Sequence, residues 1–276
     1  MRLFNKVAIV GVGLIGGSMA LAIKRKKLAN QVIGVSRHKK TLLRAKKRHA
    51  IDKGSQDIGI VKDADLVILA TPVNTILNLA PIISKIIRPD CIVSDVGSTK
   101  QKIVSQLDKI FPRYVGSHPL AGSEKRGMIN ACPDIFKGSL CILTPTKNTD
   151  RGALEKIRRL WRQLGAEVFS LTPAIHDKIL SFVSHLPHIV AFSLIDIIPK
   201  QYLEFASTGL KDATRIAASD SQLWLDIFLS NRKNMLKTID LFQENLYRIK
   251  KAINKKDKKL LNTILKRAKS KREILG

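Results

Sequence analysis

Cysteine and aromatic residues are scarce in this sequence, and each shortage excludes a class of protein. The 276 residues include three cysteines, Cys91, Cys132 and Cys141, whose number and spacing suit neither a disulfide framework nor a metal site. We therefore expect them to be reduced and buried, and we expect no bound metal. Aromatic residues make up 5% of the chain, too few to interleave with basic residues in a nucleic-acid recognition motif.

Acidic residues are also scarce, at 22 against 49 Lys and Arg, which gives a formal net charge of +27. Such a charge attracts polyanions, and the basic residues concentrate in Lys24–Lys27, Arg37–Arg48 and Arg248–Arg272. Because no recognition motif accompanies them, we interpret these segments as solvated helix faces and expect no specific nucleic-acid partner. The same field attracts small anionic substrates.

The most apolar stretch, Val7–Ile23, follows a basic start, as a signal peptide or a membrane span would. Glycines at positions 11, 13, 16 and 17 fit a tight phosphate-binding turn better than an apolar helix. We therefore expect a cytoplasmic protein that has no membrane partner.

Short apolar, β-branched runs alternate with helix-length segments up to about residue 171. This alternation predicts an α/β fold in which residues 1–171 form a Rossmann-like, doubly wound parallel sheet. The predicted strands are Val7–Val10, Val32–Val35, Leu66–Ala70, Ile92–Asp95, Tyr114–Gly116, Leu140–Leu143 and Glu167–Leu171. The predicted helices between them include Gly17–Lys27, Asn74–Ile87 and Asp150–Leu164.

Strand patterns disappear after Leu171, so residues 172–276 are predicted to form an all-helical substrate and dimerisation domain. Its predicted helices are Pro173–Ile198, Gln201–Ala218, Gln222–Asn254 and Asp257–Lys271. The third carries an apolar stripe at three- and four-residue spacing, formed by Met235, Ile239, Phe242, Leu246, Ile249 and Ile253. The stripe can pack within its own domain or against a second copy of the chain, and we favour a homodimer.

The first predicted strand runs directly into Gly11-Val12-Gly13-Leu14-Ile15-Gly16, and a helix follows. In this pattern the first glycine permits the turn, the second lets the backbone approach a pyrophosphate, and the third lets helix and strand pack closely. We therefore assign Gly11, Gly13, Leu14, Ile15 and Gly16 to cofactor binding. Thr71 and Pro72, which follow another predicted strand, join them.

The second strand is followed by Ser36 and Arg37, where a fold that prefers NAD usually carries an acidic residue for the ribose hydroxyls. A hydroxyl and a guanidinium suit a 2′-phosphate instead, so NADP is weakly favoured over NAD. The alternative is that both are ordinary loop residues and that cofactor selectivity is loose.

Ser98 and His118 follow predicted strands, and ligands of open α/β sheets bind beyond the carboxyl ends of strands. His118 is predicted to lie in a loop, where a catalytic role is as plausible as a structural one. In the helical half, His185 and His188 flank a proline and could each simply bind a backbone carbonyl.

Five segments together resemble the prephenate and arogenate dehydrogenase family of tyrosine biosynthesis. They are the glycine motif, DVGSTK at 95–100, GSHPLAGSE at 116–124, SHLPH at 184–188 and TRIA at 214–217. The resemblance covers nearly the whole chain, and it implies an oxidative decarboxylation of prephenate to 4-hydroxyphenylpyruvate with hydride transfer to NAD(P)+.

The resemblance also implies roles for single residues. His118 would take the proton of the ring hydroxyl and Ser98 would orient that histidine, while Arg215 would pair with a substrate carboxylate. His188 would contact the substrate side chain, and Ser123 and Glu124 would complete the substrate site. Having His188 favours prephenate over arogenate.

Three alternatives to this function stay open. The chain could be an arogenate dehydrogenase, or a β-hydroxyacid dehydrogenase, although that class uses a lysine of its helical domain as the acid and base. Outside enzymes, it could be a basic module that senses the cofactor or binds nucleic acid.

Overall fold

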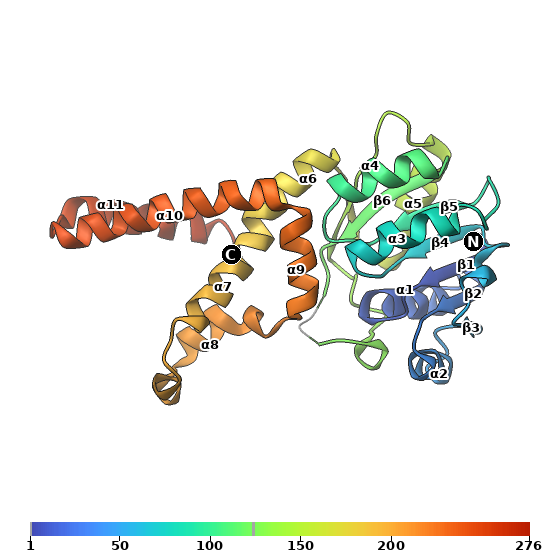
Figure 1. The fold of residues 1–276 in the computed structure, drawn as a ribbon, viewed down its shortest axis with the longest axis horizontal. Helices are drawn as coiled ribbons and strands as arrows, with labels where there is room; N and C mark the ends of the chain where they lie inside the picture. Colours follow the sequence, from blue (N-terminus) through green and yellow to red (C-terminus); the bar gives the residue numbers. More distant parts are fainter. Residues whose placement is uncertain (1, 123–124) are drawn as a thin grey trace. The chain divides into compact units, whose positions relative to one another are not determined.

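A mostly parallel sheet flanked by helices forms the amino-terminal part of the chain, as predicted (Figure 1). The computed structural model describes residues 2–122 and 125–276. The strands are β1 (Phe4–Val10), β2 (Ala29–Val35), β3 (Lys53–Ser55), β4 (Leu66–Leu69), β5 (Ile92–Asp95), β6 (Tyr114–Pro119), β7 (Leu140–Leu143) and β8 (Glu167–Ser170). Their order across the sheet is β3-β2-β1-β4-β5-β6-β7-β8, and β7 runs antiparallel to β6.

In the described part of the chain, five helices cover the sheet, and the first, third and fifth begin and end within four residues of the predicted positions. They are α1 (Leu14–Arg25), α2 (Lys39–Lys47), α3 (Val73–Ile83), α4 (Gln101–Ile110) and α5 (Arg151–Leu164). Strand side chains alternate between two cores: in β1, Val7 and Ile9 pack with α1 and α5, whereas Ala8 and Val10 pack with α3 and α4. Burial on both faces explains why the strands are almost wholly apolar.

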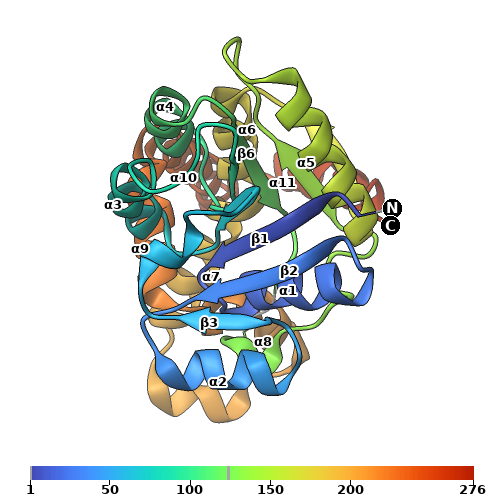
Figure 2. The ribbon, with the colours of Figure 1, turned by 90° about the vertical axis from the view of Figure 1, so that its right-hand side faces the viewer.

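The structure adds one strand to those predicted and extends another toward the candidate site. The short edge strand β3, beside β2 in Figure 2, was missed because its sequence, Lys-Gly-Ser, has no apolar pattern. The strand that begins at Tyr114 continues past Gly116 to Pro119, because Ser117–Pro119 pair with the antiparallel strand β7. His118 therefore lies in a buried strand, and its predicted loop position is wrong.

The helical segments after β8 are α6 (Pro173–Leu180), the π-helical turn η3 (Ser181–His185), α7 (Leu186–Asp196), the 3₁₀ helix η4 (Lys200–Phe205), α8 (Thr208–Thr214), the 3₁₀ helix η5 (Arg215–Ala218), α9 (Ser221–Ser230), α10 (Arg232–Asn254) and α11 (Lys258–Glu273). The predicted helix 201–218 is thus broken into three pieces, around a bend at Ala206 and Ser207. The predicted helix 222–254 is interrupted at Asn231, whose side chain donates to the backbone carbonyl of Asp177.

The π-helical turn has a local cause. Pro187 has no N–H to donate to the carbonyl four residues earlier, and the N–H of Leu186 instead reaches the carbonyl of Ser181, five residues back.

The stretch Pro173–Asp196 is long and apolar enough to cross a membrane by length and composition alone. Its residues Leu180, Val183 and His188 line a pocket that is described below.

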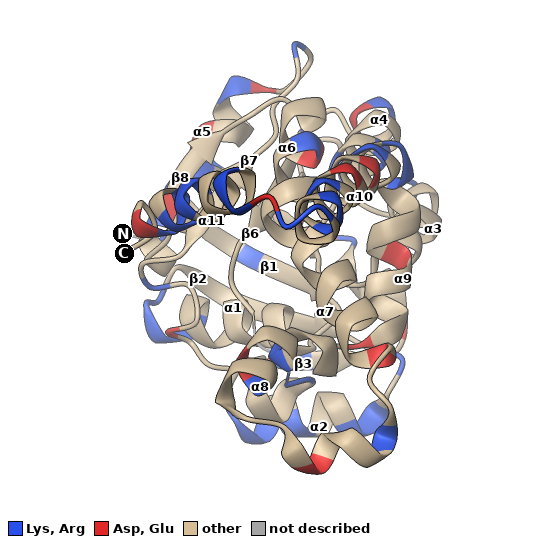
Figure 3. Ribbon diagram, turned by 90° about the vertical axis from the view of Figure 1, so that its left-hand side faces the viewer, with Lys and Arg blue, Asp and Glu red and all other residues tan. Residues whose placement is uncertain are grey.

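By internal contacts the chain forms two compact units, Met1–Asn231 and Arg232–Gly276. Helices α6 to α9 therefore belong to the same unit as the sheet, which differs from the predicted boundary near residue 171. The second unit consists of α10 and α11, and Lys and Arg occupy many positions of both helices (Figure 3). Cys132 is exposed, contrary to expectation, while Cys91 and Cys141 are buried as predicted.

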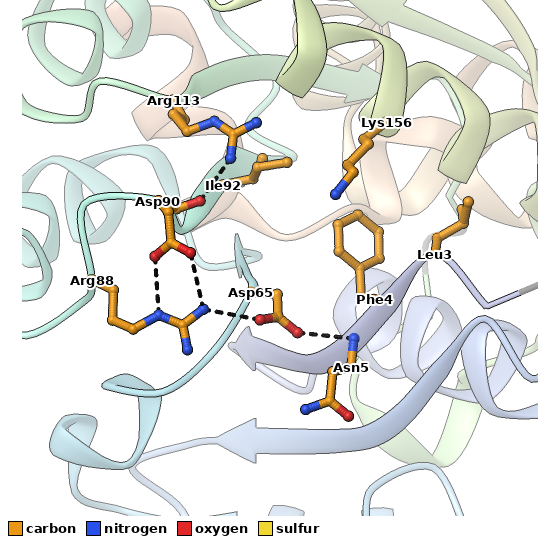
Figure 4. A pocket seen from close by; sticks show the side chains of 9 residues that line it. All are labelled: Leu3, Phe4, Asn5, Asp65, Arg88, Asp90, Ile92, Arg113 and Lys156. Atoms are coloured by element: carbon orange, nitrogen blue, oxygen red, sulfur yellow. Dashed lines mark hydrogen bonds and ion pairs between the residues drawn. The ribbon is translucent and has the colours of Figure 1, made fainter.

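The amino ends of the strands form a polar pocket of about 200 Å³, shown in Figure 4. Arg88 bridges the carboxylates of Asp65 and Asp90 at 3.0 Å each, and Arg113 donates to the carbonyl of Asp90 at 2.9 Å. Asp65 also accepts from the N–H of Asn5. These polar groups satisfy one another, so the pocket braces the starts of the strands.

Candidate active site

A cavity of about 520 Å³ lies beyond the carboxyl ends of β1, β2 and β4. Among the residues predicted to bind a cofactor, those that line it are Gly11, Gly13, Ser36, Arg37, Thr71 and Pro72. The others, Leu14, Ile15 and Gly16, form the first turn of α1 and do not line the cavity. Sequence reasoning missed Gln56 and Ile58, which line it just after the unpredicted strand β3.

The glycine turn is shaped for a close ligand. Gly11 has a φ of +99°, and a Cβ there would lie 2.4 Å from the carbonyl oxygen of Ala70. A Cβ on Gly16 would lie 2.0 Å from the carbonyl oxygen of Gly11, whereas one on Gly13 would meet nothing within 4 Å. The space beside Gly13 is thus open toward the cavity.

Two further features fit a bound dinucleotide. Gly13 is the N-cap of α1 and offers no side chain to the first N–H groups of the helix, which remain for an anion such as a pyrophosphate. The Thr71 hydroxyl oxygen is buried without a hydrogen-bond partner, although Thr71 lines the cavity. A buried hydroxyl without a partner is costly, and a ligand's polar group would satisfy it.

The loop after β2 lines the part of the cavity beside β3. Gln56 donates to the carbonyl of Arg37 at 2.7 Å, and the hydroxyl of Ser36 accepts from the N–H of His38. None of the described residues that line this cavity is Asp or Glu. The loop is therefore partly ordered by its own hydrogen bonds and presents no carboxylate to a ligand.

A second cavity, of about 440 Å³, is lined by the end of β6 and by residues of α6, η3, α7, η5 and α9. It brings together His118, His188 and Arg215, which lie far apart in the sequence but were each predicted as site residues. Leu180, Val183, Ile216 and Trp224 supply an apolar wall. A pocket with an apolar wall and a few convergent polar groups suits a small organic anion.

His188 is held on two sides. Its Nδ1 donates to the carbonyl of Ser184 at 2.9 Å, and its ring stacks on Trp224 with centroids 3.5 Å apart. Arg215, in η5, is exposed and lines the same cavity. Burial, opposed by the Ser184 carbonyl, lowers the pKa of His188 and favours its neutral form.

His118 has a partner that sequence reasoning missed. Its Nδ1 lies 2.8 Å from Nε2 of His176, and Nδ1 of His176 lies 2.8 Å from a carboxylate oxygen of Asp177. The Asp177 carboxylate in turn accepts from the backbone N–H groups of Lys100 and Gln101, at 2.7 and 2.9 Å. His118, His176 and Asp177 thus form a hydrogen-bonded row, and all three side chains are buried.

The two ends of the DVGSTK segment, Asp95 and Lys100, form an ion pair next to these three side chains. The Lys100 ammonium pairs with Asp95 and donates to the carbonyl of Ser117 at 2.7 Å, next to His118. Asp95 also accepts from the Tyr114 hydroxyl at 2.6 Å and from the N–H of Gly97 at 2.8 Å. Among the described residues, the buried cation has two hydrogen-bond acceptors and the buried carboxylate has three donors, which offsets the cost of burying charge.

Burial is the largest cause of the lowered histidine pKa values. It holds the pKa of His118 well below its ordinary value, assisted by His176, Lys100 and His185, and it lowers the pKa of His185 to about 4. For His176, burial outweighs the opposing effect of Asp177. Below about pH 6.5 the unfolded chain binds protons that the folded protein excludes, so stability falls as the pH drops through that value.

Of the remaining predicted site residues, only Ser98 lies in the part of the chain that the structure describes. Ser98 lies in the turn after β5, does not line the cavity and forms no hydrogen bond with His118, whose Nδ1 is taken by His176. Ser123 and Glu124 lie outside the described residues. Within the described ranges, no group of three or more His, Cys, Asp or Glu side chains could hold a metal ion.

Comparison with known families decides between the dehydrogenase classes. The model of the prephenate dehydrogenase nucleotide-binding domain matches residues 19–170, and that of the prephenate dehydrogenase dimerization domain matches residues 172–267. The chain belongs to the prephenate dehydrogenase family. The predicted resemblance is thereby confirmed.

Individual relatives extend the family match over the chain. Prephenate dehydrogenase of Bacillus subtilis is 36% identical over 98% of this chain and 76% of its own length. Cyclohexadienyl dehydrogenase of Zymomonas mobilis is 32% identical over 93% of this chain and 91% of its own. The structure of the Aquifex aeolicus prephenate dehydrogenase, in complex with hydroxyphenyl propionate and NAD+, superposes with a TM-score of 0.94 and 37% identity, covering 99% of this chain and 98% of its own.

The two glycines of the turn should respond differently to alanine. Gly11→Ala puts a Cβ into a positive-φ position against the Ala70 carbonyl and should destabilise the protein by at least about 1–3 kcal/mol. Gly13→Ala has room for its Cβ, so its thermal stability should match the wild type while cofactor affinity falls. Thermal melts with and without cofactor measure both effects. A Gly11→Ala variant as stable as the wild type would contradict the requirement for glycine at the first position of the turn.

Proposed function

We propose that the protein is a prephenate dehydrogenase, which oxidises prephenate and releases carbon dioxide to give 4-hydroxyphenylpyruvate. One observation carries the proposal: a buried, neutral histidine, His118, lines a cavity together with Arg215 and His188 in a chain of this family. The nucleotide cavity lies at the same edge of the sheet, since β1, β2, β4, β5 and β6 are parallel.

The reaction needs a base at the ring hydroxyl and a binding site for carboxylates. A bound nicotinamide dinucleotide supplies the hydride acceptor for the ring carbon that carries the hydroxyl. His118 Nε2 takes the hydroxyl proton, and the ketone that forms is conjugated to the carbon bearing the ring carboxylate. Loss of that carboxylate as carbon dioxide returns its bonding pair to the ring, which becomes aromatic. The protein therefore supplies positioning and one base.

The remaining residues receive roles from their places. Arg215 pairs with a substrate carboxylate, because its guanidinium lines the cavity and offers forked hydrogen bonds. His188, fixed by Ser184 and Trp224, contacts the substrate side chain. We keep Ser123 and Glu124 as substrate-binding residues on the family resemblance alone, and Ser98 as a further active-site residue on the same ground.

For the cofactor, we propose that NADP is used at least as well as NAD. Ser36 and Arg37 line the nucleotide cavity, and no described lining residue carries the carboxylate that would repel a 2′-phosphate. The structure with NAD+ from Aquifex aeolicus supports the general class of cofactor.

We further propose that the chain acts as a cytoplasmic homodimer, with a nucleotide-binding domain of residues 1–171 and a helical domain of residues 172–276. The dimerization-domain model matches the helical part. Large apolar side chains are exposed on α10 and just after α7, among them Leu246 at 48% and Ile253 at 59% on α10, and Ile197 at 72% directly after α7. Exposed apolar surface of this kind is typical of an interface.

The central test is His118→Asn, assayed with prephenate and with arogenate as the comparison substrate. Turnover of prephenate should fall by about 10² to 10⁴, the usual contribution of a positioned base, while the protein stays folded. Since burial holds the pKa of His118 well below its ordinary value, kcat/KM of the wild type should stay flat as the pH falls through 6.5 and should decline only at a pH well below 6.5. The control His49→Asn changes an exposed histidine outside both cavities, and equal losses in the two variants would refute the role.

Cofactor choice is tested by the double variant Ser36→Asp with Arg37→Ala. Its ratio of kcat/KM for NADP to kcat/KM for NAD should fall about tenfold or more, the effect of losing one charge-assisted hydrogen bond. Lys40→Ala removes a neighbouring exposed charge that does not line the cavity, and it should leave the ratio almost unchanged. A wild type that strongly prefers NAD would contradict the proposal.

Dimer formation is tested by Phe242→Glu in α10, which should dissociate or unfold the protein because a charge replaces part of the apolar stripe. Gln243→Glu, at the next and exposed position, adds the same charge and should leave the dimer intact. Sedimentation equilibrium over a range of concentrations measures the outcome. A wild type that stays monomeric throughout would rule the dimer out.

A further inference from the structure

We propose that His176 and Asp177 are positioning residues that fix the tautomer of His118, so that its Nε2 faces the substrate cavity without a proton. The inference rests on the proposed function for its catalytic meaning. Its structural content stands on the contacts of three buried side chains that come from β6 and α6.

The argument begins at Asp177, where the direction of each hydrogen bond is certain. Both carboxylate oxygens accept from backbone N–H groups at the start of α4, those of Lys100 and Gln101. A backbone N–H can only donate, and an ionised carboxylate can only accept. Both oxygens of Asp177 are thus fixed as acceptors by donors that cannot reverse their role.

From Asp177 the proton positions follow in sequence. The oxygen that binds Lys100 N–H also contacts Nδ1 of His176, so Nδ1 of His176 must carry the proton and donate it. In neutral His176 the other nitrogen, Nε2, is then an acceptor. Its partner is Nδ1 of His118 at 2.8 Å, which must therefore donate. His118 is left with its proton on Nδ1 and a free electron pair on Nε2.

This tautomer is the one that the proposed reaction needs. His118 lines the cavity, and with Nδ1 bound to His176 its Nε2 is the ring nitrogen that can receive a proton from a substrate. Free histidine prefers the opposite tautomer, so the row works against the intrinsic preference of the ring. When Nε2 takes a proton, Nδ1 keeps its bond to His176, and the Asp177 carboxylate compensates the new positive charge through that ring.

The other charged groups around the row do not offer an alternative partner. Lys100, from the start of α4, is paired with Asp95 of β5, and Asp95 also binds the Tyr114 hydroxyl of β6. His185, from η3, lies 3.2 Å from the side-chain amide of Asn231 through its Nδ1. Asp177 is thus the anion that is hydrogen-bonded to the histidine pair within the described part of the chain.

The first experiment compares two substitutions of His176 with a control. His176→Leu removes the acceptor for His118 and should lower kcat about 10²-fold with a change in KM below about threefold, since the loss falls on the base and not on binding. His176→Gln can place an amide oxygen where Nε2 was, and it should restore kcat to within about tenfold of the wild type. His185→Gln, a buried histidine not bonded to His118, should lower thermal stability comparably without the loss in kcat.

The second experiment reads the tautomer directly and needs no substrate. In protein labelled with ¹⁵N-histidine, the ring nitrogens of His118 should show a protonated Nδ1 and an unprotonated Nε2, with His118→Asn used to assign the signals. His176→Leu should shift His118 toward the opposite tautomer, and His185→Gln should leave it unchanged.

The outcomes separate the two claims. A wild-type His118 that carries its proton on Nε2, or a folded His176→Leu variant with wild-type kcat, would overturn the positioning role. If His176→Leu fails to fold, the wild-type tautomer and the kcat of His176→Gln decide. Failure of the wild type to turn over prephenate would refute the proposed function, while the tautomer measurement would still stand or fall by itself.

Discussion

Two backbone N–H groups at the start of α4 bind the Asp177 carboxylate, and this contact joins the helical segment α6 to the sheet. The same turn supplies Lys100, whose ammonium pairs with Asp95 and holds the Ser117 carbonyl beside His118. Because the side chains of Asp95, Lys100 and Asp177 are buried, loss of a partner leaves an uncompensated charge, at a cost on the order of several kcal/mol. The arrangement of the substrate cavity therefore depends on a closed set of polar contacts.

Charge acts at two scales in this protein. Locally, the cavity places Arg215 and His188 on an apolar background, which suits an anion with a hydrophobic ring. Globally, the formal net charge of +27 favours the approach of small anions, and prephenate is one. The basic helix faces can attract small anionic ligands without any nucleic-acid partner. This attraction weakens at higher ionic strength, because salt screens the charges.

Local patterns in the sequence predicted most strands and the site residues at their ends, but they missed β3 and placed His118 in a loop. The glycine motif, Ser36, Arg37, Thr71 and His118 were all predicted, because turn chemistry and strand ends are local signals. The pairing of His118 with His176 was not predicted, since 58 residues separate them and no periodicity links a strand to a later helix. The buried ion pair of Asp95 and Lys100 was not predicted either, because the DVGSTK motif by itself does not show which of its side chains are buried, and Ser98 of the same motif lies outside the cavity.

The sequence pattern also failed to predict where helices end or change, because tertiary contacts and proline decide this. Asn231 ends one helix because its amide is held by the Asp177 carbonyl, and Pro187 widens the turn before it.

The account as a whole is tested most directly by the stoichiometry of the wild-type reaction with prephenate, measured as reduced cofactor and carbon dioxide formed per substrate consumed. It predicts one of each, with 4-hydroxyphenylpyruvate as the product. Release of carbon dioxide without cofactor reduction, or no consumption of prephenate, would contradict it.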